Sequence, residues 1–173
     1  MAPRVLVAYA SRYGGVREIA EVVADALRAR GLEVDVYPAD EVTRVRPYDA
    51  VVLGSGVYFG AWLPEATELL ESFQSELAQK PVWLFSSGST EAGTEASAAD
   101  TAPPEPLAPL VALIQPRGVR RFAGRVEGEK LSLDDWLVNP ALRSASADLR
   151  DWDAIRAWGA EIAAALLARQ QER

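Results

Sequence analysis

Residues 4–27 read RVLVAYASRYGGVREIAEVVADAL, and this stretch decides how the rest of the sequence is interpreted. It begins with the apolar run VLVAYA, which is typical of a strand buried on both faces of a parallel sheet. Apolar residues then recur three and four positions apart, at Ile19, Val23 and Leu27, which predicts an amphipathic helix. The sequence therefore predicts a βα unit whose helix opens directly after the glycine-containing loop SRYGGV.

The loop at residues 11–16 suits an anion. A helix N-terminus presents unpaired N–H groups and the positive end of the helix dipole. Gly14 and Gly15 let the backbone approach a phosphate closely, Ser11 adds a hydroxyl, and Arg12 adds positive charge. An ordinary βα turn with two glycines explains the same residues, so both interpretations stand at this point.

Composition limits the chemistry that the chain can perform. Its 173 residues predict one globular domain over 1–173, and a net charge of −7 argues against nucleic acid as the main partner. Cysteine and histidine are absent from the sequence, which removes the thiolate nucleophile and the commonest general base. Demanding chemistry would therefore come from a bound cofactor. Because the sequence has no long apolar run and no secretory signal, we expect a cytoplasmic protein without a transmembrane segment.

Short apolar runs alternate with helical patterns along the chain, which is typical of an open parallel α/β sheet. The predicted strands are residues 5–9, 33–37, 50–53, 82–85 and 119–123. The predicted helices are residues 16–30, a segment from Pro64 to about Leu77, residues 107–114, and a last helix that begins near Asp151, its predicted N-cap. We expect residues 87–106 to form a mobile surface loop and residues 124–150 to form an irregular insertion before the last helix.

Ligands of such sheets bind beyond the carboxyl ends of the strands. The segments that leave the first, third and fourth strands are SRYGGV, GSGVYFGAW and SSGST, and all three should converge there. A phosphate seat beside an aromatic loop suits flavin mononucleotide (FMN), with Tyr58, Phe59 or Trp62 stacked on the ring. Phe59 and Trp62 fit equally well as core residues that pack against the following helix.

Other phosphate-binding proteins match less well. A Walker loop needs Gly-Lys-Ser/Thr, but the first lysine of the chain is Lys80. The dinucleotide fingerprint G-x-G-x-x-G does not follow the first strand. A receiver domain needs a phosphorylatable aspartate at the end of the third strand, where Leu53-Gly54-Ser55 stands instead.

Three motifs carry a family resemblance over essentially the whole chain. Residues 11–20, SRYGGVREIA, match the pattern Thr/Ser-Arg-x-Gly-x-Thr-Arg-Glu-Ile-Ala, and residues 54–60 match a glycine- and aromatic-containing loop. The pair Asp151-Trp152 matches the opening of the family's last helix. The chain thus resembles the flavodoxins, and within them the flavodoxin-like family that includes the menaquinone-dependent protoporphyrinogen oxidases. The resemblance implies a flavodoxin-like three-layer α/β sandwich with a five-stranded parallel sheet of order 2-1-3-4-5.

The resemblance also implies a binding site for FMN. By position, the phosphate would be wrapped by Ser11, Arg12, Tyr13, Gly14, Gly15 and Val16, one side of the ring would be flanked by Ser55, Gly56, Val57, Tyr58, Phe59 and Gly60, and the other side would be lined by Ser86, Ser87, Gly88 and Ser89. Val16 departs from the pattern, because a threonine whose hydroxyl binds the phosphate is usual there. No catalytic side chain and no metal ligand is implied.

Three functions follow from this resemblance. The leading one is electron transfer between redox protein partners through noncovalent FMN. The alternative is an enzyme, a protoporphyrinogen IX oxidase of haem biosynthesis that uses FMN and a quinone; the segment 124–150 departs from that branch because it is not net basic. The third is a degenerate flavin-free domain that only contacts partners, and Val16 is its best support.

Overall fold

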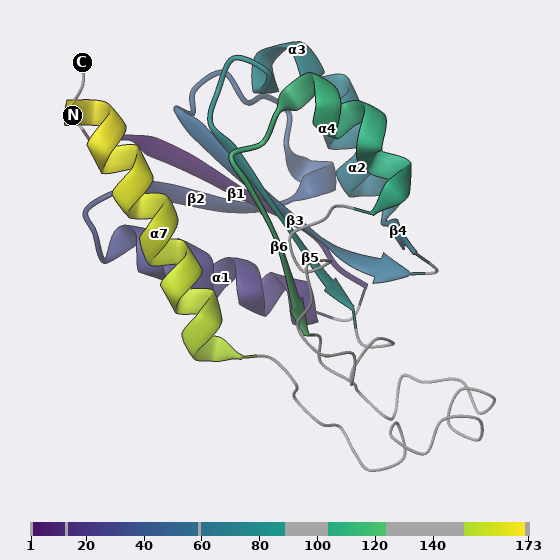
Figure 1. Cartoon of the computed structure of the whole chain (residues 1–173), viewed down its shortest axis with the longest axis horizontal. Helices are drawn as coiled ribbons and strands as arrows, with labels where there is room; N and C mark the ends of the chain where they lie inside the picture. Colours follow the sequence, from purple (N-terminus) through teal and green to yellow (C-terminus); the bar gives the residue numbers. More distant parts are fainter. Residues whose placement is uncertain (1, 13, 59, 89–103, 124–150, 172–173) are drawn as a thin grey trace.

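A five-stranded parallel sheet forms the centre of the molecule (Figure 1). The computed structural model describes residues 2–12, 14–58, 60–88, 104–123 and 151–171. The parallel strands are β1 (Arg4–Ala10), β2 (Glu33–Pro38), β3 (Ala50–Tyr58), β5 (Val82–Gly88) and β6 (Gly118–Ala123), and their order is β2-β1-β3-β5-β6. A short strand, β4 (Ala61–Trp62), pairs antiparallel with β3. Since β5 and β6 are the fourth and fifth parallel strands, the predicted order 2-1-3-4-5 is confirmed.

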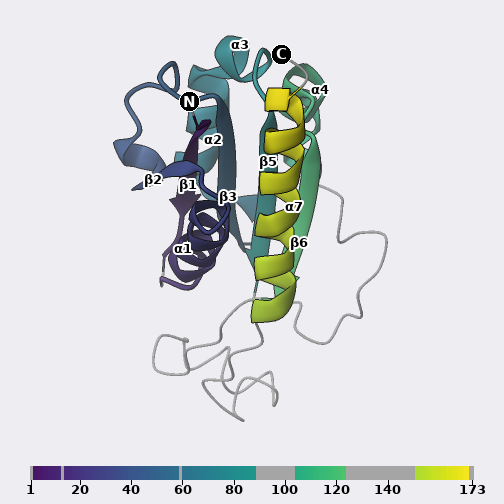
Figure 2. The ribbon, with the colours of Figure 1, turned by 90° about the vertical axis from the view of Figure 1, so that its left-hand side faces the viewer.

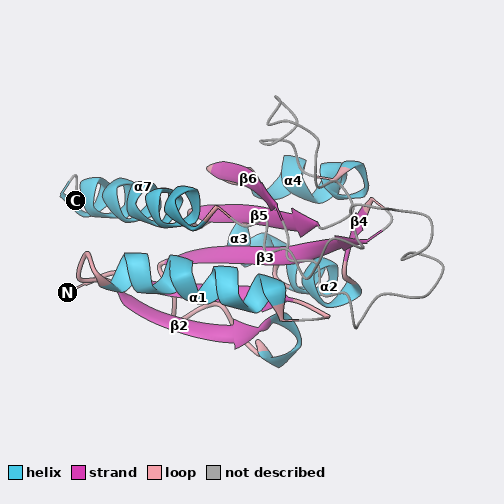
Figure 3. Ribbon diagram, turned by 90° about the horizontal axis from the view of Figure 1, so that it is seen from below, coloured by secondary structure: helices cyan, strands magenta, loops and turns pink. Residues whose placement is uncertain are grey.

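Helices cover both faces of the sheet (Figures 2 and 3). One face carries α1 (Gly15–Arg28) and α7 (Trp152–Gln171). The other carries α2 (Pro64–Ser72), α3 (Gln74–Leu77), α4 (Ala108–Ile114) and the 3-10 helices η1 (Ala39–Glu41) and η3 (Glu105–Leu107). No helix in the described parts of the chain is both long and apolar enough to cross a bilayer.

The alternation of side chains along β1 builds two separate cores. Val5 and Val7 pack against α1 and α7, whereas Leu6 and Ala8 pack against the helices of the other face. All four are fully buried, which explains why the strand is a continuous apolar run. On the first face α1 and α7 approach closely, because a Cβ atom on Gly159 would lie 2.6 Å from the Cβ of Ala26.

Strand β3 is longer than the sequence predicted. It was expected to end at Leu53, yet the ladder continues through Tyr58 and turns back into β4 through Gly60, which has a φ of 77°. Glycines and serines carry no apolar periodicity, but their backbones pair as well as any other. Gly54 is required inside the strand, because a Cβ atom there would lie 2.0 Å from Cζ of the buried Phe85.

Two other expectations need correction. The predicted helix from Pro64 is divided into α2 and α3 at Phe73, whose φ of −115° is not helical. The predicted loop 87–106 is shorter at both ends, because Ser87 and Gly88 belong to β5 and Glu105–Leu107 forms η3. Its remainder, and the predicted insertion at residues 124–150, lie outside the described residues. The predicted N-cap of the last helix is confirmed, since Ala154 N donates to Asp151 Oδ1 at 3.0 Å.

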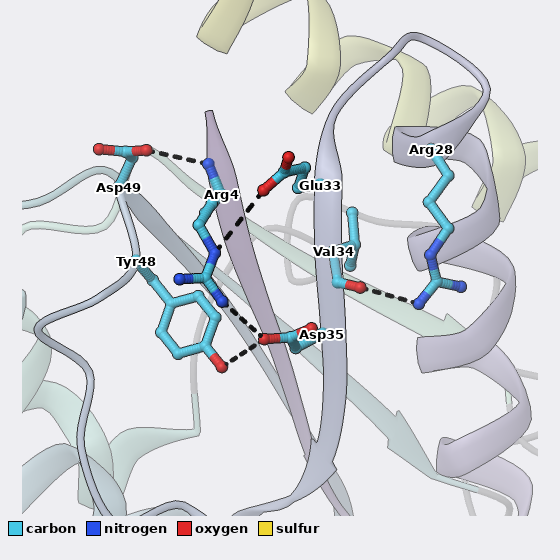
Figure 4. A network of polar contacts seen from close by, with 7 residues as sticks. All are labelled: Arg4, Arg28, Glu33, Val34, Asp35, Tyr48 and Asp49. Carbon is cyan, nitrogen blue, oxygen red and sulfur yellow. Dashed lines mark hydrogen bonds and ion pairs between the residues drawn. The ribbon is translucent and has the colours of Figure 1, made fainter. Parts of the chain in front are cut away.

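Arg4 ties the amino-terminal edge of the sheet together (Figure 4). Its backbone N donates to Asp49 Oδ2 at 2.9 Å, and its guanidinium donates to Asp35 Oδ2 at 3.3 Å. The same Asp35 oxygen accepts the hydroxyl of Tyr48 at 2.7 Å. Figure 4 also shows Arg28 of α1 donating to the carbonyl of Val34 in β2, at 2.9 Å. These contacts fasten β1, β2, α1 and the segment before β3 to one another.

Lys80 fastens the segment before β3 from the other side. Its ammonium group donates to the carbonyl oxygens of Val45 at 2.8 Å, Arg46 at 3.2 Å and Tyr48 at 2.5 Å. Burial lowers the pKa of Lys80 from its ordinary value. Because Lys80 lies just before β5, it fixes the starts of β3 and β5 relative to each other.

The bond from Tyr48 to Asp35 predicts a late tyrosine titration. Burial first, and then the hydrogen bond and charge of Asp35, raise the pKa of Tyr48 from 10.0 to about 12. The folded pKa lies above the unfolded one, so this contribution to stability is complete below pH 10.0 and is lost as the pH rises toward 12. We expect an absorbance titration of tyrosinate to show a step near pH 12 that Tyr48→Phe lacks. Identical titration curves for both proteins would contradict the assignment.

The close approach of Gly54 and Phe85 predicts a measurable steric coupling. Gly54→Ala should lower the free energy of unfolding by about 1–3 kcal/mol, because the new methyl group overlaps the Phe85 ring. Phe85→Leu removes the Cε and Cζ atoms that cause the overlap. In urea unfolding, the double variant should therefore be more stable than the sum of the two single changes by roughly 1 kcal/mol. Additive effects would show that the overlap is relieved elsewhere.

Candidate functional site

The loop between β1 and α1 forms an open cradle at the carboxyl edge of the sheet. Gly14 is the N-cap of α1 and has a φ of 85°, a conformation that favours glycine. Its N donates to Ser11 Oγ at 3.0 Å, and its carbonyl accepts the N–H of Glu18 at 3.2 Å. A Cβ atom on Gly14 would meet nothing within 4 Å, so this side of the backbone faces open space. No described side chain caps α1, and an uncapped helix N-terminus is a favourable position for an anion.

The side chain of Val16 points away from the surface of this loop. Its side chain is 4% exposed and packs in the core between α1 and the sheet. Only its backbone therefore belongs to the loop surface. The side chain of Arg12 is exposed at the end of the loop, and Tyr13 lies outside the described residues.

A polar pocket of about 370 Å³ lies beside this loop, and sequence reasoning did not find it. Ser11 and Arg12 form one side, Asp40 of η1 forms another, and Glu65 at the start of α2 closes it. The two acidic residues come from segments far apart in the sequence, so only the fold brings them to the end of β1. Their carboxylates make this side of the loop less favourable for a phosphate than the N-terminus of α1.

The ends of β3 and β5 carry the buried polar residues of the described chain, which are Ser55, Ser86 and Ser87. Ser55 pairs with Ser86 in the ladder, one strand away from Ala10 at the end of β1. The segments that leave β1, β3 and β5 thus lie on adjacent strands at one edge, as the sequence predicted. Three neighbouring hydroxyl groups are held there in water-poor surroundings.

Two of these hydroxyls are engaged inside the protein. Ser55 Oγ accepts the backbone N–H of Leu63 at 3.0 Å and donates to Gly56 O at 2.8 Å. Ser86 Oγ accepts the indole N–H of Trp62 at 2.7 Å. The bonds from Leu63 and Trp62 hold β4 and the start of α2 onto the sheet. The predicted ring-lining role of these two serines stays a prediction.

Trp62 itself belongs to the core. It is 6% exposed and packs with the residues of the α2 face, which confirms the core interpretation of this residue. Val57 is half-buried and packs at the same cluster. The side chains of Tyr58 and Phe59 lie outside the described part of the structure, as does Ser89.

Ser87 differs from the other two serines. It is 5% exposed and lies on the face of α1, opposite to Ser86, and its neighbour in β3 is Gly56. Its hydroxyl has no hydrogen-bond partner among the described residues. The Ser87 side chain, unlike those of Ser55 and Ser86, makes no bond to β4 or to the start of α2. Its predicted place beside the ring stays a prediction.

Sequence reasoning also missed Arg121, which pairs with Ser86 in the ladder near the end of β6. Only strand pairing reveals that this residue belongs to the same edge as the three serines. The sequence offered one signal for the position of Arg121. Side chains alternate between the two faces of the predicted strand 119–123, so Arg121 and the buried Phe122 lie on opposite faces.

Comparison with known proteins assigns the chain to a family. The flavodoxin domain family (Flavodoxin_5) matches residues 6–137, which is most of the chain. The chain therefore belongs to the flavodoxin domain family. The sequence motifs implied the flavodoxin-like family and, within it, the protoporphyrinogen oxidase branch. The comparisons support the family and give no support to the branch.

Solved structures share the fold. Rubredoxin:oxygen oxidoreductase of Desulfovibrio gigas matches with a TM-score of 0.64 and 17% identity, over 98% of this chain but only 38% of its own. A flavodoxin from the domain Archaea matches with a TM-score of 0.58 and 16% identity, over 94% of this chain and 98% of its own. A flavodoxin of Streptococcus pneumoniae TIGR4 matches with a TM-score of 0.55 and 19% identity, over 96% of this chain and 99% of its own. At these identities the similarity shows the fold alone.

The three serines should respond differently to removal of the hydroxyl. Ser55→Ala leaves the N–H of Leu63 without a partner, and Ser86→Ala does the same to the indole of Trp62, so each should lower the free energy of unfolding by about 1–3 kcal/mol. Ser87→Ala breaks no bond among the described residues and should change it by less than about 0.5 kcal/mol. Urea unfolding measures all three. A loss at Ser87 as large as at Ser86 would contradict the distinction.

Proposed function

We propose that this chain binds FMN noncovalently and transfers electrons between redox proteins. The observation that carries the proposal is the cradle at Gly14, where a left-handed backbone, an uncapped helix N-terminus and open space coincide at the end of β1. A side chain in place of this glycine would occupy the space that a phosphate needs. The geometry therefore fits the terminal phosphate of FMN.

The ring would extend from this phosphate toward the ends of β3 and β5. There the Ser87 hydroxyl and the backbone of Gly56 are adjacent in the ladder, and either can hydrogen-bond the edge of a flat heteroaromatic ring. When bound, FMN supplies the exchange of electrons. The residues of the chain would bind and orient it. Membership of the flavodoxin domain family supports this reading of the site.

The enzyme alternative has no observation of its own. A protoporphyrinogen oxidase would be marked by the segment 124–150, which lies outside the described residues, and no comparison points to a porphyrin or a quinone. The flavin-free alternative depends on Val16, whose side chain is buried in the core. Val16 removes only the threonine hydroxyl that is usual at this position, and it leaves the backbone cradle at Gly14 intact. We therefore favour FMN binding. The cytoplasmic location and the redox protein partners stay predictions.

The cradle predicts that a side chain at Gly14 blocks FMN. Gly31 is a matched control, because it has a φ of 88°, its Cβ would also face open space, and it follows the other end of α1. Gly14→Val and Gly31→Val should each cost about 1–3 kcal/mol of stability, because valine is strained at positive φ. Only Gly14→Val should weaken FMN binding, by about 100-fold or more, in a titration followed by quenching of flavin fluorescence.

Two results would count against the proposal in different ways. Equal FMN affinities for Gly14→Val and Gly31→Val would move the phosphate away from this loop. Failure of the unmodified chain to bind FMN at all would favour the flavin-free alternative, provided that the protein is folded in the same buffer.

A further inference from the structure

The outward side of helix α4 is apolar. Its exposed residues are Ala108, Pro109, Ala112 and Leu113, whose spacing places them on one side of the helix. Leu113 is 61% exposed, and Tyr37 of β2 is the only other exposed large hydrophobic among the described residues. The outward side of a surface helix normally carries polar or charged residues. An apolar outward side is typical of a surface that another protein covers.

Helix α2 has the opposite kind of outward side. Glu65, Glu68 and Glu71 are exposed, and their spacing of three residues makes them neighbours on one side of the helix. No lysine or arginine occurs between Arg46 and Lys80. Within the described parts of the chain, none of the three glutamates takes part in an ion pair. Like charges so close together repel one another, and a cationic partner would relieve that repulsion.

The helices of the other face pair their charges within the protein. Three ion pairs lie along α1 and α7, and they join Arg17 to Glu21 at 3.1 Å, Arg28 to Asp25 at 3.2 Å and Arg156 to Asp153 at 3.2 Å. Glu161 of α7 is paired with Arg120 at 3.4 Å. The row of unpaired carboxylates on α2 is therefore not shared by the helices α1 and α7.

The apolar side of α4 and the acidic side of α2 belong to one layer of the molecule. Helices α2, α3 and α4 cover the same face of the sheet (Figures 1 and 3) and pack on the same core, with Leu70 of α2 and Ile114 of α4 both buried in it. Helix α3 follows α2 and contacts α4. The outer surface of this layer thus combines an apolar area with a row of carboxylates.

We propose that the outward sides of α2 and α4 form a docking surface for a basic amphipathic helix of a partner protein. Charge complementarity identifies this partner, because its apolar residues would cover α4 while its lysines or arginines meet the glutamates of α2. A second copy of this chain fits less well, since a symmetric contact on α4 would bring two sets of the same glutamates to one interface. The inference goes beyond the proposed function and does not require FMN.

A synthetic amphipathic peptide, with leucines on one side of the helix and lysines on the other, serves as the probe. Its binding to the full chain without FMN is measured by fluorescence anisotropy at low ionic strength. Leu113→Ser should weaken binding by about 3- to 30-fold, because apolar contact is lost. Glu68→Gln combined with Glu71→Gln should weaken it by about 3- to 10-fold, and by less at high salt.

The chain offers a matched control for each change. Tyr37→Ser removes the other exposed large hydrophobic, and it should bind the peptide as the unmodified chain does. Glu21→Gln combined with Glu161→Gln changes the net charge by the same amount on α1 and α7, and it should also leave the affinity unchanged. Because Leu113 is exposed, urea unfolding of Leu113→Ser should match that of the unmodified chain.

Four results would overturn the inference. The unmodified chain could fail to bind the peptide, or Leu113→Ser could bind it as tightly as Tyr37→Ser does. Equal losses in the two double variants would show that only the net charge acts. Sedimentation that reveals a dimer of the unmodified chain, dissociated by Leu113→Ser, would assign the surface to a second copy. Each of these results leaves the FMN titration unaffected, so this inference and the proposed function fail separately.

Discussion

The parallel ladder is the constraint on which the rest of the structure depends. Because β1, β3 and β5 run in the same direction, their carboxyl ends meet at one edge, where Ala10, Ser55 and Ser86 form a row. Helix α1 must begin at that edge in order to return along the sheet, which places Gly14 beside the row. The meeting of these strand ends with the start of α1 thus follows from topology, and the residues at this edge would decide which ligand fits there.

Alternation along the strands then places similar residues on opposite faces of the sheet. Ser86 and Ser87 are neighbours in β5, yet the first accepts a hydrogen bond from the Trp62 indole on the α2 face and the second lies on the α1 face. Arg120 and Arg121 are separated in the same way in β6. A single step along a strand therefore changes the role of a side chain completely, while leaving its distance from the edge almost the same.

The sequence predicted the elements well where the signal is local. The βα unit at 4–27 and the cap at Asp151 depend on periodicity and on single residues, and both are confirmed. The extension of β3 through Gly54 was not predictable, because paired backbone leaves no apolar pattern. The buried position of Trp62 and the place of Arg121 depend on contacts between distant strands, which no local pattern encodes. The strand order came from the family resemblance and not from the periodicity.

Charge acts at two ranges in this protein. The chain carries a net charge of −7, whereas strands β3, β4, β5 and β6 together contain only two charged side chains, Arg120 and Arg121. Exposed charges farther than about 8–10 Å from the site are largely screened at physiological ionic strength, so the acidic exterior acts mainly on the approach of a partner. A half-buried charge is screened much less than an exposed one. For a flavin bound as proposed, groups at the edge of the sheet would therefore affect the reduction potential more than the net charge of the surface, which would act mostly on the rate of encounter.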